Sequence, residues 1–313
     1  MRKLSAPLIA LASLIALAFA PSAQAKPLTS TGPGVRVGGG DLVTVGTGYQ
    51  WWARSPGVRR PMGSIAKVMT ALVVLDAGHL NREIKVTAAT IRYVRKDGAS
   101  SAGLIKGDRL TTRELLEAML LPSGCDAAFL LATSYGPGRA AFIAKMNATA
   151  LRLGMTSTHF TSFDGMPYPT EHSTYSTPAD LVKLGLAAMK YPVFRRIVRQ
   201  HSFYLPKTTS HHSYLWYTTD GLLRTYHGAE GIKTGDTKAA GNCLLFEAKR
   251  DGRTLLGVVL HASPNNNPVS AINTAAQVLN WGFSQVKTAS PAAIARTRAA
   301  RVPPRTQRHI PAS

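Results

Sequence analysis

Residues 243–261 read CLLFEAKRDGRTLLGVVLH. Two apolar runs, 243–248 and 254–261, flank a polar segment that contains the pair Asp251-Gly252. An Asp-Gly pair between two strand-like runs is a strong hairpin signal, because a tight hairpin turn needs residues that tolerate positive φ. The stretch therefore predicts two antiparallel strands joined by a short turn.

The sequence around this hairpin predicts a mixed α/β fold. Residues 41–53 alternate weakly and are expected to form strands near the other end of the chain. Helical signals fill the middle, so the simplest assembly is one antiparallel sheet built from both chain ends and flanked by helices, with a mostly helical inserted subdomain. The first expected helix covers residues 65–75 and stops at Gly78, and the second opens with the Thr111/Glu114 capping box and ends at Pro122. Asp126 is expected to cap a third helix over 127–135, and a fourth over 139–153 stops at Gly154. Two more are expected, one that starts at Thr177-Pro178 and one over 269–283.

The two ends of the chain are expected to lie outside this domain. Arg2 and Lys3 precede a short apolar run, and Ala23-Gln24-Ala25 resembles a cleavage site, so residues 1–25 are expected to be a signal peptide. An uncleaved membrane anchor is the alternative. The catalytic domain would then span residues 26–287. Residues 288–313, with five arginines and no acid, are expected to be a disordered basic tail.

Composition limits the partners. The chain has 313 residues, 45% of them hydrophobic, and a formal net charge of +21. Such a basic protein attracts polyanions. Export argues against nucleic acid and favours contact with anionic wall polymers or the membrane surface, on the outer face of the cytoplasmic membrane or outside the cell. A generally solvated basic surface is the alternative. No zinc-binding motif is present, and the sequence predicts neither a metal nor another cofactor.

Three short motifs carry the chemistry. Ser64 and Lys67 stand three residues apart, which places them on one face of a helix, and an amine can activate a serine hydroxyl as a nucleophile. Taken alone, such a pair is also an N-cap serine with a solvated lysine. Ser123-Gly124-Cys125 follows on a predicted loop, and Lys233-Thr234-Gly235 precedes the hairpin at the position of a strand. The ordered set is far more specific than any one motif.

With these motifs the chain resembles the serine-type D-alanyl-D-alanine carboxypeptidases and transpeptidases of the low-molecular-mass penicillin-binding family, peptidase family S11, and their Streptomyces-type members in particular. The likeness covers about residues 56–283. Further strings that carry it are Lys67-Val68-Met69-Thr70, Thr158-His159-Phe160, Phe163-Asp164-Gly165 and Tyr175-Ser176-Thr177-Pro178. The resemblance implies a β-lactamase/transpeptidase-like fold and action on peptidoglycan stem peptides that end in D-Ala-D-Ala, with β-lactam antibiotics as inhibitors.

The resemblance also implies a role for each motif. Ser64 would be the nucleophile, Lys67 the base and Ser123 a proton relay. Lys233, Thr234 and Gly235 would bind substrate. The backbone N–H groups of Ser64 and Asp236 would form the oxyanion hole.

Two positions depart from the family pattern. Cys125 stands where asparagine is usual in the middle motif, and a thiol hydrogen-bonds only weakly, so its expected contact with substrate is altered. Cys125 and Cys243 could form a disulfide across the cleft or remain free thiols, and the sequence leaves both open. Asp236 is unusual beside an oxyanion, and its carboxylate would have to point away.

Three other functions are weighed against the carboxypeptidase. A strict transpeptidase of the same fold would pass the acyl group to an amine instead of water. A class A-like β-lactamase would need a Glu-x-x-x-Asn element, whereas Glu171 lies in Thr-Glu-His-Ser-Thr. A non-catalytic wall-binding protein would not need Ser64, Lys67 and Lys233 together.

Overall fold

The computed structural model describes residues 32–97, 99–262, 267 and 269–288. The predicted signal peptide lies outside these residues, and so does the predicted tail beyond Thr288. In the part of the chain that the structure describes, no helix combines the length and the apolar character needed to cross a bilayer.

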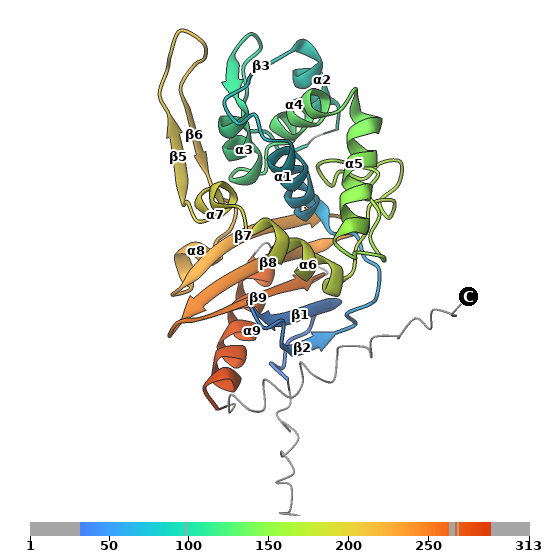
Figure 1. The fold of residues 1–313 in the computed structure, drawn as a ribbon, viewed down its shortest axis with the longest axis vertical. Coiled ribbons are helices and arrows are strands. Elements are labelled where there is room, and N and C mark those ends of the chain that lie inside the picture. Colours follow the sequence, from blue (N-terminus) through green and yellow to red (C-terminus); the bar gives the residue numbers. More distant parts are fainter. Residues whose placement is uncertain (1–31, 98, 263–266, 268, 289–313) are drawn as a thin grey trace, which may run out of the picture. The chain divides into compact units, whose positions relative to one another are not determined.

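The centre of the fold is a five-stranded antiparallel sheet in the order β2-β1-β9-β8-β7 (Figure 1). Both ends of the chain contribute to it, as the sequence predicts. The predicted hairpin is β8–β9, and its turn places Asp251 and Gly252 at φ 50° and 72°. The strand bounds are β1 Gly39–Thr44, β2 Gln50–Arg54, β7 Ala229–Thr237, β8 Gly241–Arg250 and β9 Arg253–Leu260.

Helices cover both faces of the sheet, which explains the continuous apolar runs of β8 and β9. Leu244 and Phe246 pack with the C-terminal helix α9 (Val269–Thr288) in one core. Leu245, which points the other way, belongs to a larger core with α1 (Ala66–Ala77) and α6 (Pro178–Ala188). Figure 1 shows α9 on one side of the sheet and α6 on the other. Successive side chains of a strand point to opposite faces, so a doubly covered strand is apolar throughout.

The inserted helical part surrounds α1, in which residues 66–75 are all buried. Gly78 ends α1 at φ 74°, the Thr111/Glu114 capping box forms, and Thr177 caps α6. These predicted signals are confirmed. The remaining elements are η1 Gly63–Ile65, α2 Ala88–Asp97, α3 Thr112–Leu120, α4 Cys125–Tyr135, α5 Arg139–Arg152, α7 Pro192–Val198, α8 Leu222–Thr225 and the small hairpins β3 Glu83–Lys85 with β4 Arg109–Thr111 and β5 Ser202–Leu205 with β6 Tyr214–Tyr217.

The expected capping role of Asp126 is wrong. Helix α4 begins two residues earlier than predicted, at Cys125, and its N-cap is Gly124. The carboxylate of Asp126 instead accepts hydrogen bonds from the backbone of Ala102 at 2.9 Å and Leu104 at 3.2 Å. Asp126 therefore fixes a distant loop against the start of α4, and a buried carboxylate with several backbone donors is well satisfied there.

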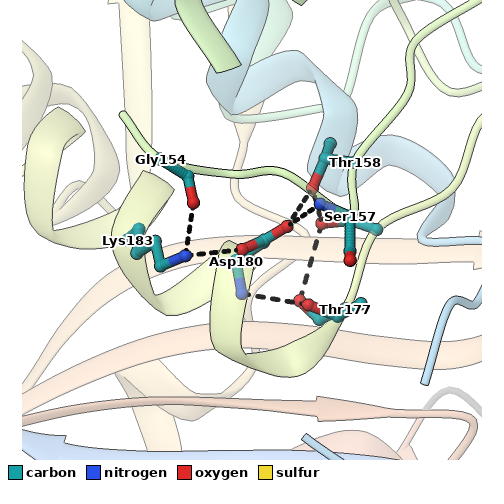
Figure 2. Close-up of polar contacts among 7 residues, drawn as sticks. Gly154, Ser157, Thr158, Thr177, Asp180 and Lys183 are labelled. Carbon is teal, nitrogen blue, oxygen red and sulfur yellow. Dashed lines mark hydrogen bonds and ion pairs between the residues drawn. The ribbon is translucent and has the colours of Figure 1, made fainter. Parts of the chain in front are cut away.

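The loop between α5 and α6, residues 153–177, is held at both ends by Asp180 on α6 (Figure 2). Its carboxylate accepts from the Ser157 backbone at 2.9 Å and from the Thr158 hydroxyl at 3.0 Å. Its other oxygen pairs with Lys183 at 2.8 Å. Figure 2 shows these donors converging on one side chain. Because Asp180 is only 3% exposed, losing its carboxylate would remove the acceptor of two partly buried donors, of which the Thr158 hydroxyl keeps a contact with the Ser176 hydroxyl.

We expect Asp180→Ala to lower the free energy of unfolding by about 1–3 kcal/mol, because the partly buried donors of Ser157 and Thr158 lose their acceptor. Lys183→Ala breaks the ion pair on the exposed side and the hydrogen bond from Lys183 to the Gly154 carbonyl, and should cost less than about 1 kcal/mol because the Lys183 amine is largely solvated. Urea unfolding followed by circular dichroism measures both values. Equal losses in the two variants would contradict an anchoring role for Asp180.

Candidate active site

Ser64 lies in the turn η1 immediately before α1, and strand β7 packs directly against this turn. A side chain at Gly63, where φ is +54°, would place a Cβ 2.7 Å from the backbone nitrogen of Asp236. A Cβ at Gly235 would clash with the carbonyl oxygen of Met62. Glycine at both positions lets the two backbones approach closely. The backbone nitrogens of Ser64 and Asp236 therefore belong to segments in direct contact.

Lys67 faces Ser64 across one helical turn. Its Nζ lies 2.8 Å from the Ser64 Oγ and donates to the carbonyl of Asp164 at 3.0 Å. The Lys67 side chain is fully buried. The carbonyl comes from the loop that Asp180 anchors, so this loop fixes the position of the amine.

Ser123 occupies a left-handed backbone conformation, with φ 63°, between α3 and α4. The hydroxyl of Ser100 donates to the Ser123 carbonyl at 2.6 Å, and the Ser100 carbonyl accepts from the backbone of Cys125 at 2.8 Å. A serine at positive φ is uncommon and needs such support from its surroundings.

Lys233 is buried on β7 and reaches the hydroxyls of two threonines. Its Nζ lies 3.2 Å from the Thr234 Oγ1 and 3.4 Å from the Thr219 Oγ1. Burial, together with the smaller effect of nearby Lys67, lowers the pKa of Lys233 to about 7, although Asp220 acts in the opposite direction. Burial likewise raises the pKa of Asp220 to about 6.

These elements open onto one pocket of about 590 Å³. That volume is typical of a site for a small ligand. Its lining includes the following residues predicted from the sequence: Ser64, Ser123, Thr234, Gly235, Asp236 and Cys243. Lys67 and Lys233 lie buried beside it, each bonded to a hydroxyl of the lining. The structure thus brings all three motifs together.

Cys125 does not contact this pocket, contrary to the expected role in substrate binding. Its side chain is fully buried, and its thiol lies 3.5 Å from the Ser100 hydroxyl. The disulfide considered from the sequence is also absent, since Cys125 and Cys243 are both free thiols. The Cys243 thiol instead donates to the carbonyl of Ala240 at 3.4 Å. Burial raises the pKa of both thiols, that of Cys243 to about 12.

We expect iodoacetamide to label both cysteines when the chain is denatured without reductant. Buried thiols with raised pKa react slowly, so labelling of the native chain should be much slower. Peptide mass spectrometry after trypsin measures both states. A cross-linked peptide pair containing Cys125 and Cys243 would contradict the free-thiol assignment.

Several residues of the site had no assigned role in the sequence. Asp164 occurs in a string that the family resemblance quotes, but its carbonyl contact with Lys67 comes from the folded loop. Thr219 and Asp220 follow β6 with no motif, and only the fold places them beside Lys233. Among the described residues, no group of three or more His, Cys, Asp or Glu side chains could hold a metal ion.

The lowered pKa of Lys233 predicts a pH-dependent stability. An unfolded lysine keeps its proton up to its usual pKa of 10.5, whereas folded Lys233 loses it near 7. Between these values the unfolded state binds more protons, so the free energy of unfolding should gain a contribution that grows as pH rises. Lys233→Met removes that contribution. Urea unfolding at about pH 7 and about pH 10 should show the wild type gaining relative to the variant. A constant difference would contradict burial of a titrating amine.

The Ser64 hydroxyl pairs with a buried amine, and the Lys-Thr-Gly strand lies beside this pair on an antiparallel sheet flanked by helices. This arrangement is that of the transpeptidase-like class of penicillin-binding proteins. Residues 42–264 match the model of the D-alanyl-D-alanine carboxypeptidase family, peptidase S11. The chain belongs to this family.

Similar proteins agree with the assignment. The chain is 39% identical over 297 residues to a D-alanyl-D-alanine carboxypeptidase of Streptomyces sp. strain K15, covering 91% of this chain and 99% of that relative. It is 37% identical over 231 residues to a D-alanyl-D-alanine carboxypeptidase of Mycobacterium tuberculosis, covering 74% and 77%. The crystal structure of the Streptomyces K15 DD-transpeptidase matches with a TM-score of 0.77 at 38% identity, covering 82% of this chain and all of that one. The predicted fold and enzyme class are confirmed.

Proposed function

We propose that this enzyme cleaves D-Ala-D-Ala ends of peptidoglycan stem peptides through an ester on Ser64. The observation that carries the proposal is the 2.8 Å contact between the Ser64 hydroxyl and the buried Lys67 amine, at a pocket that Ser123 and Thr234 also line. A serine hydroxyl becomes a nucleophile when a positioned base takes its proton.

In the acylation step, the Lys67 amine accepts the proton of Ser64 while the Ser64 Oγ attacks the carbonyl between the two D-alanines. The developing oxyanion accepts hydrogen bonds from the backbone N–H groups of Ser64 and Asp236, on the two segments that the glycine contact joins. Ser123 relays a proton to the departing nitrogen, and free D-alanine leaves.

The terminal carboxylate of the substrate would bind at Thr234. The Thr219 and Thr234 hydroxyls lie 2.6 Å apart, and Lys233 donates toward both. A protonated amine with two hydroxyls is well suited to hold a carboxylate. Carboxylate binding would also favour the charged form of Lys233, which burial alone disfavours.

The acyl-enzyme then passes to water or to an amine. The names of the relatives include both carboxypeptidase and DD-transpeptidase. Hydrolysis gives carboxypeptidase activity, and attack by an amine of a second peptide gives the alternative, transpeptidase activity. The buried Cys125 supplies no amide to hold substrate, so the backbone of β7 has to position the peptide.

We further propose that the chain is exported by its N-terminal segment and acts in the cell wall. The resemblance of residues 1–25 to a signal peptide supports export. The net charge of +21 supports contact with anionic wall polymers or anionic lipid headgroups. β-Lactam antibiotics, as analogues of the D-Ala-D-Ala end, would acylate Ser64.

The proposal predicts a covalent penicillin adduct that depends on Ser64. Intact mass after incubation with penicillin G should rise by one penicillin per chain, and Ser64→Ala should show no adduct. D-Alanine release from diacetyl-L-lysyl-D-Ala-D-Ala should fall by about four orders of magnitude or more in Ser64→Ala.

Three outcomes separate the alternatives. An adduct on Ser64→Ala would refute the nucleophile. D-Alanine released only when an amine acceptor is added would indicate a strict transpeptidase. Fast hydrolysis of nitrocefin would indicate a β-lactamase. In that case the penicillin adduct on Ser64 would be short-lived.

A further inference from the structure

A groove with a basic lining lies on the helical part of the fold. Its first hollow, of about 670 Å³, is lined by three arginines, Arg92 and Arg95 on α2 and Arg139 at the start of α5. A second hollow, of about 710 Å³, adjoins the first, because Tyr93 and Arg139 line both. Figure 1 shows α2 and α5 in the helical part of the chain. We call the two hollows together the arginine groove.

The three arginines of this groove lack an acidic partner. None of them forms an ion pair with any residue that the structure describes. The described residues that line the two hollows also include no carboxylate. Arg92 and Arg95 stand three positions apart on α2, so their like charges lie on one face of the helix and repel each other. A bound anion would relieve this repulsion, so the groove is suited to a negatively charged ligand.

Aromatic rings lie beside these charges. Tyr93 stacks on Phe129 with ring centroids 5.0 Å apart, and the Arg139 guanidinium lies 6.0 Å from the Tyr93 ring centroid. The Tyr93 hydroxyl donates to the Asp164 carboxylate at 2.6 Å, which fixes the ring. Tyr168, which is 65% exposed, lines the second hollow. An exposed tyrosine offers an apolar ring and a hydroxyl, so this hollow suits a ligand unit that has both C–H groups and hydroxyls.

The kind of anion follows from the chemistry and shape of the groove. A planar guanidinium pairs two N–H donors with two phosphate oxygens, which makes arginine well suited to phosphodiesters. Hydroxyl-bearing units between the phosphates would meet the tyrosine rings. A flexible polymer can follow two successive hollows, whereas a flat bilayer surface would touch only their rims. A phosphodiester polymer therefore fits the groove better than a layer of lipid headgroups does.

We propose that the arginine groove binds a phosphodiester polymer with polyol or sugar units, and so holds the enzyme on the cell wall. This inference rests on the export in the proposed function, and it does not depend on the reaction at Ser64. Met166 and Pro167 line both the second hollow and the Ser64 pocket. The bound polymer would therefore lie next to the active site and leave Ser64 accessible.

Binding of fluorescein-labelled poly(glycerol phosphate), measured by fluorescence anisotropy, tests the inference. The groove variant combines Arg92→Gln, Arg95→Gln and Arg139→Gln. We expect its Kd at low salt to rise by about tenfold or more, because three contacts with phosphate are lost. The slope of log Kd against log salt should also fall by about two, since each neutralised phosphate of a single chain contributes about 0.7 to it.

A second triple variant, with Arg36→Gln, Arg54→Gln and Arg224→Gln, is the matched control. It loses the same charge as the groove variant, from exposed positions outside both hollows. Its Kd should rise by less than about threefold, because distant exposed charges act on the polymer only through a screened field.

Three outcomes would overturn the inference. Equal losses in the two triple variants would mean that general charge, and not the groove, carries binding. A wild-type chain that does not bind poly(glycerol phosphate) would leave the groove without its ligand. Binding to phosphatidylglycerol vesicles that depends on the groove, without such binding to the soluble polymer, would assign the groove to lipid.

The penicillin adduct keeps this inference distinct from the proposed function. None of the three groove arginines lines the Ser64 pocket, so the groove variant should form the adduct at the wild-type rate. If its adduct formation falls, the single change Arg92→Gln replaces it, and an unchanged Kd for the polymer in that variant overturns the inference. A wild-type chain that binds the polymer but forms no adduct overturns the proposed function and leaves the groove assignment in place.

Discussion

The contact between β7 and the turn that carries Ser64 is the constraint on which the rest of the site depends. Backbone meets backbone there because Gly63 and Gly235 have no side chains. The contact brings a helix start and a sheet edge together, and with them the nitrogens of Ser64 and Asp236. Neither element could supply an oxyanion site alone. Any side chain at these glycines would push the strand away and open the pocket between the two layers.

Two buried amines beside one pocket raise an electrostatic problem, which the fold reduces with neutral and acidic partners. Lys67 points to the Asp164 carbonyl and the Ser64 hydroxyl, and Lys233 is surrounded by two threonine hydroxyls with Asp220 nearby. Burying charges without such partners would cost several kcal/mol each. The lowered pKa of Lys233 indicates that these partners offset its burial only in part. A bound carboxylate would favour the charged form of Lys233, so the surroundings of this amine suit an anionic group.

The sequence predicted features that local rules determine. Short-range geometry determines three of them: the Asp251-Gly252 turn, the Thr111/Glu114 capping box and the end of α1 at Gly78. Predictions failed where tertiary contacts decide. Asp126 looks like a helix cap, but backbone groups of a distant loop occupy its carboxylate. The position of Cys243 in the chain suggested that this residue lies near the cleft, and it lines the pocket. The sequence could not show that its thiol points to the Ala240 carbonyl and not to Cys125. The order of the motifs predicted that Ser64, Ser123 and Lys233 lie close together. The places of Thr219 and of the Asp164 carbonyl in the site became visible only in the folded chain.

One loop connects stability, chemistry and recognition in this protein. Asp180 holds both ends of residues 153–177 through Ser157, Thr158 and the helix that Thr177 caps. The same loop presents the Asp164 carbonyl to Lys67 and Glu171 to the pocket. A shift of this loop would therefore change both the hydrogen bond of the Lys67 amine and the wall of the pocket that Glu171 forms. The Asp180 contacts that hold the start of this loop therefore support the surroundings of Lys67 and one wall of the pocket.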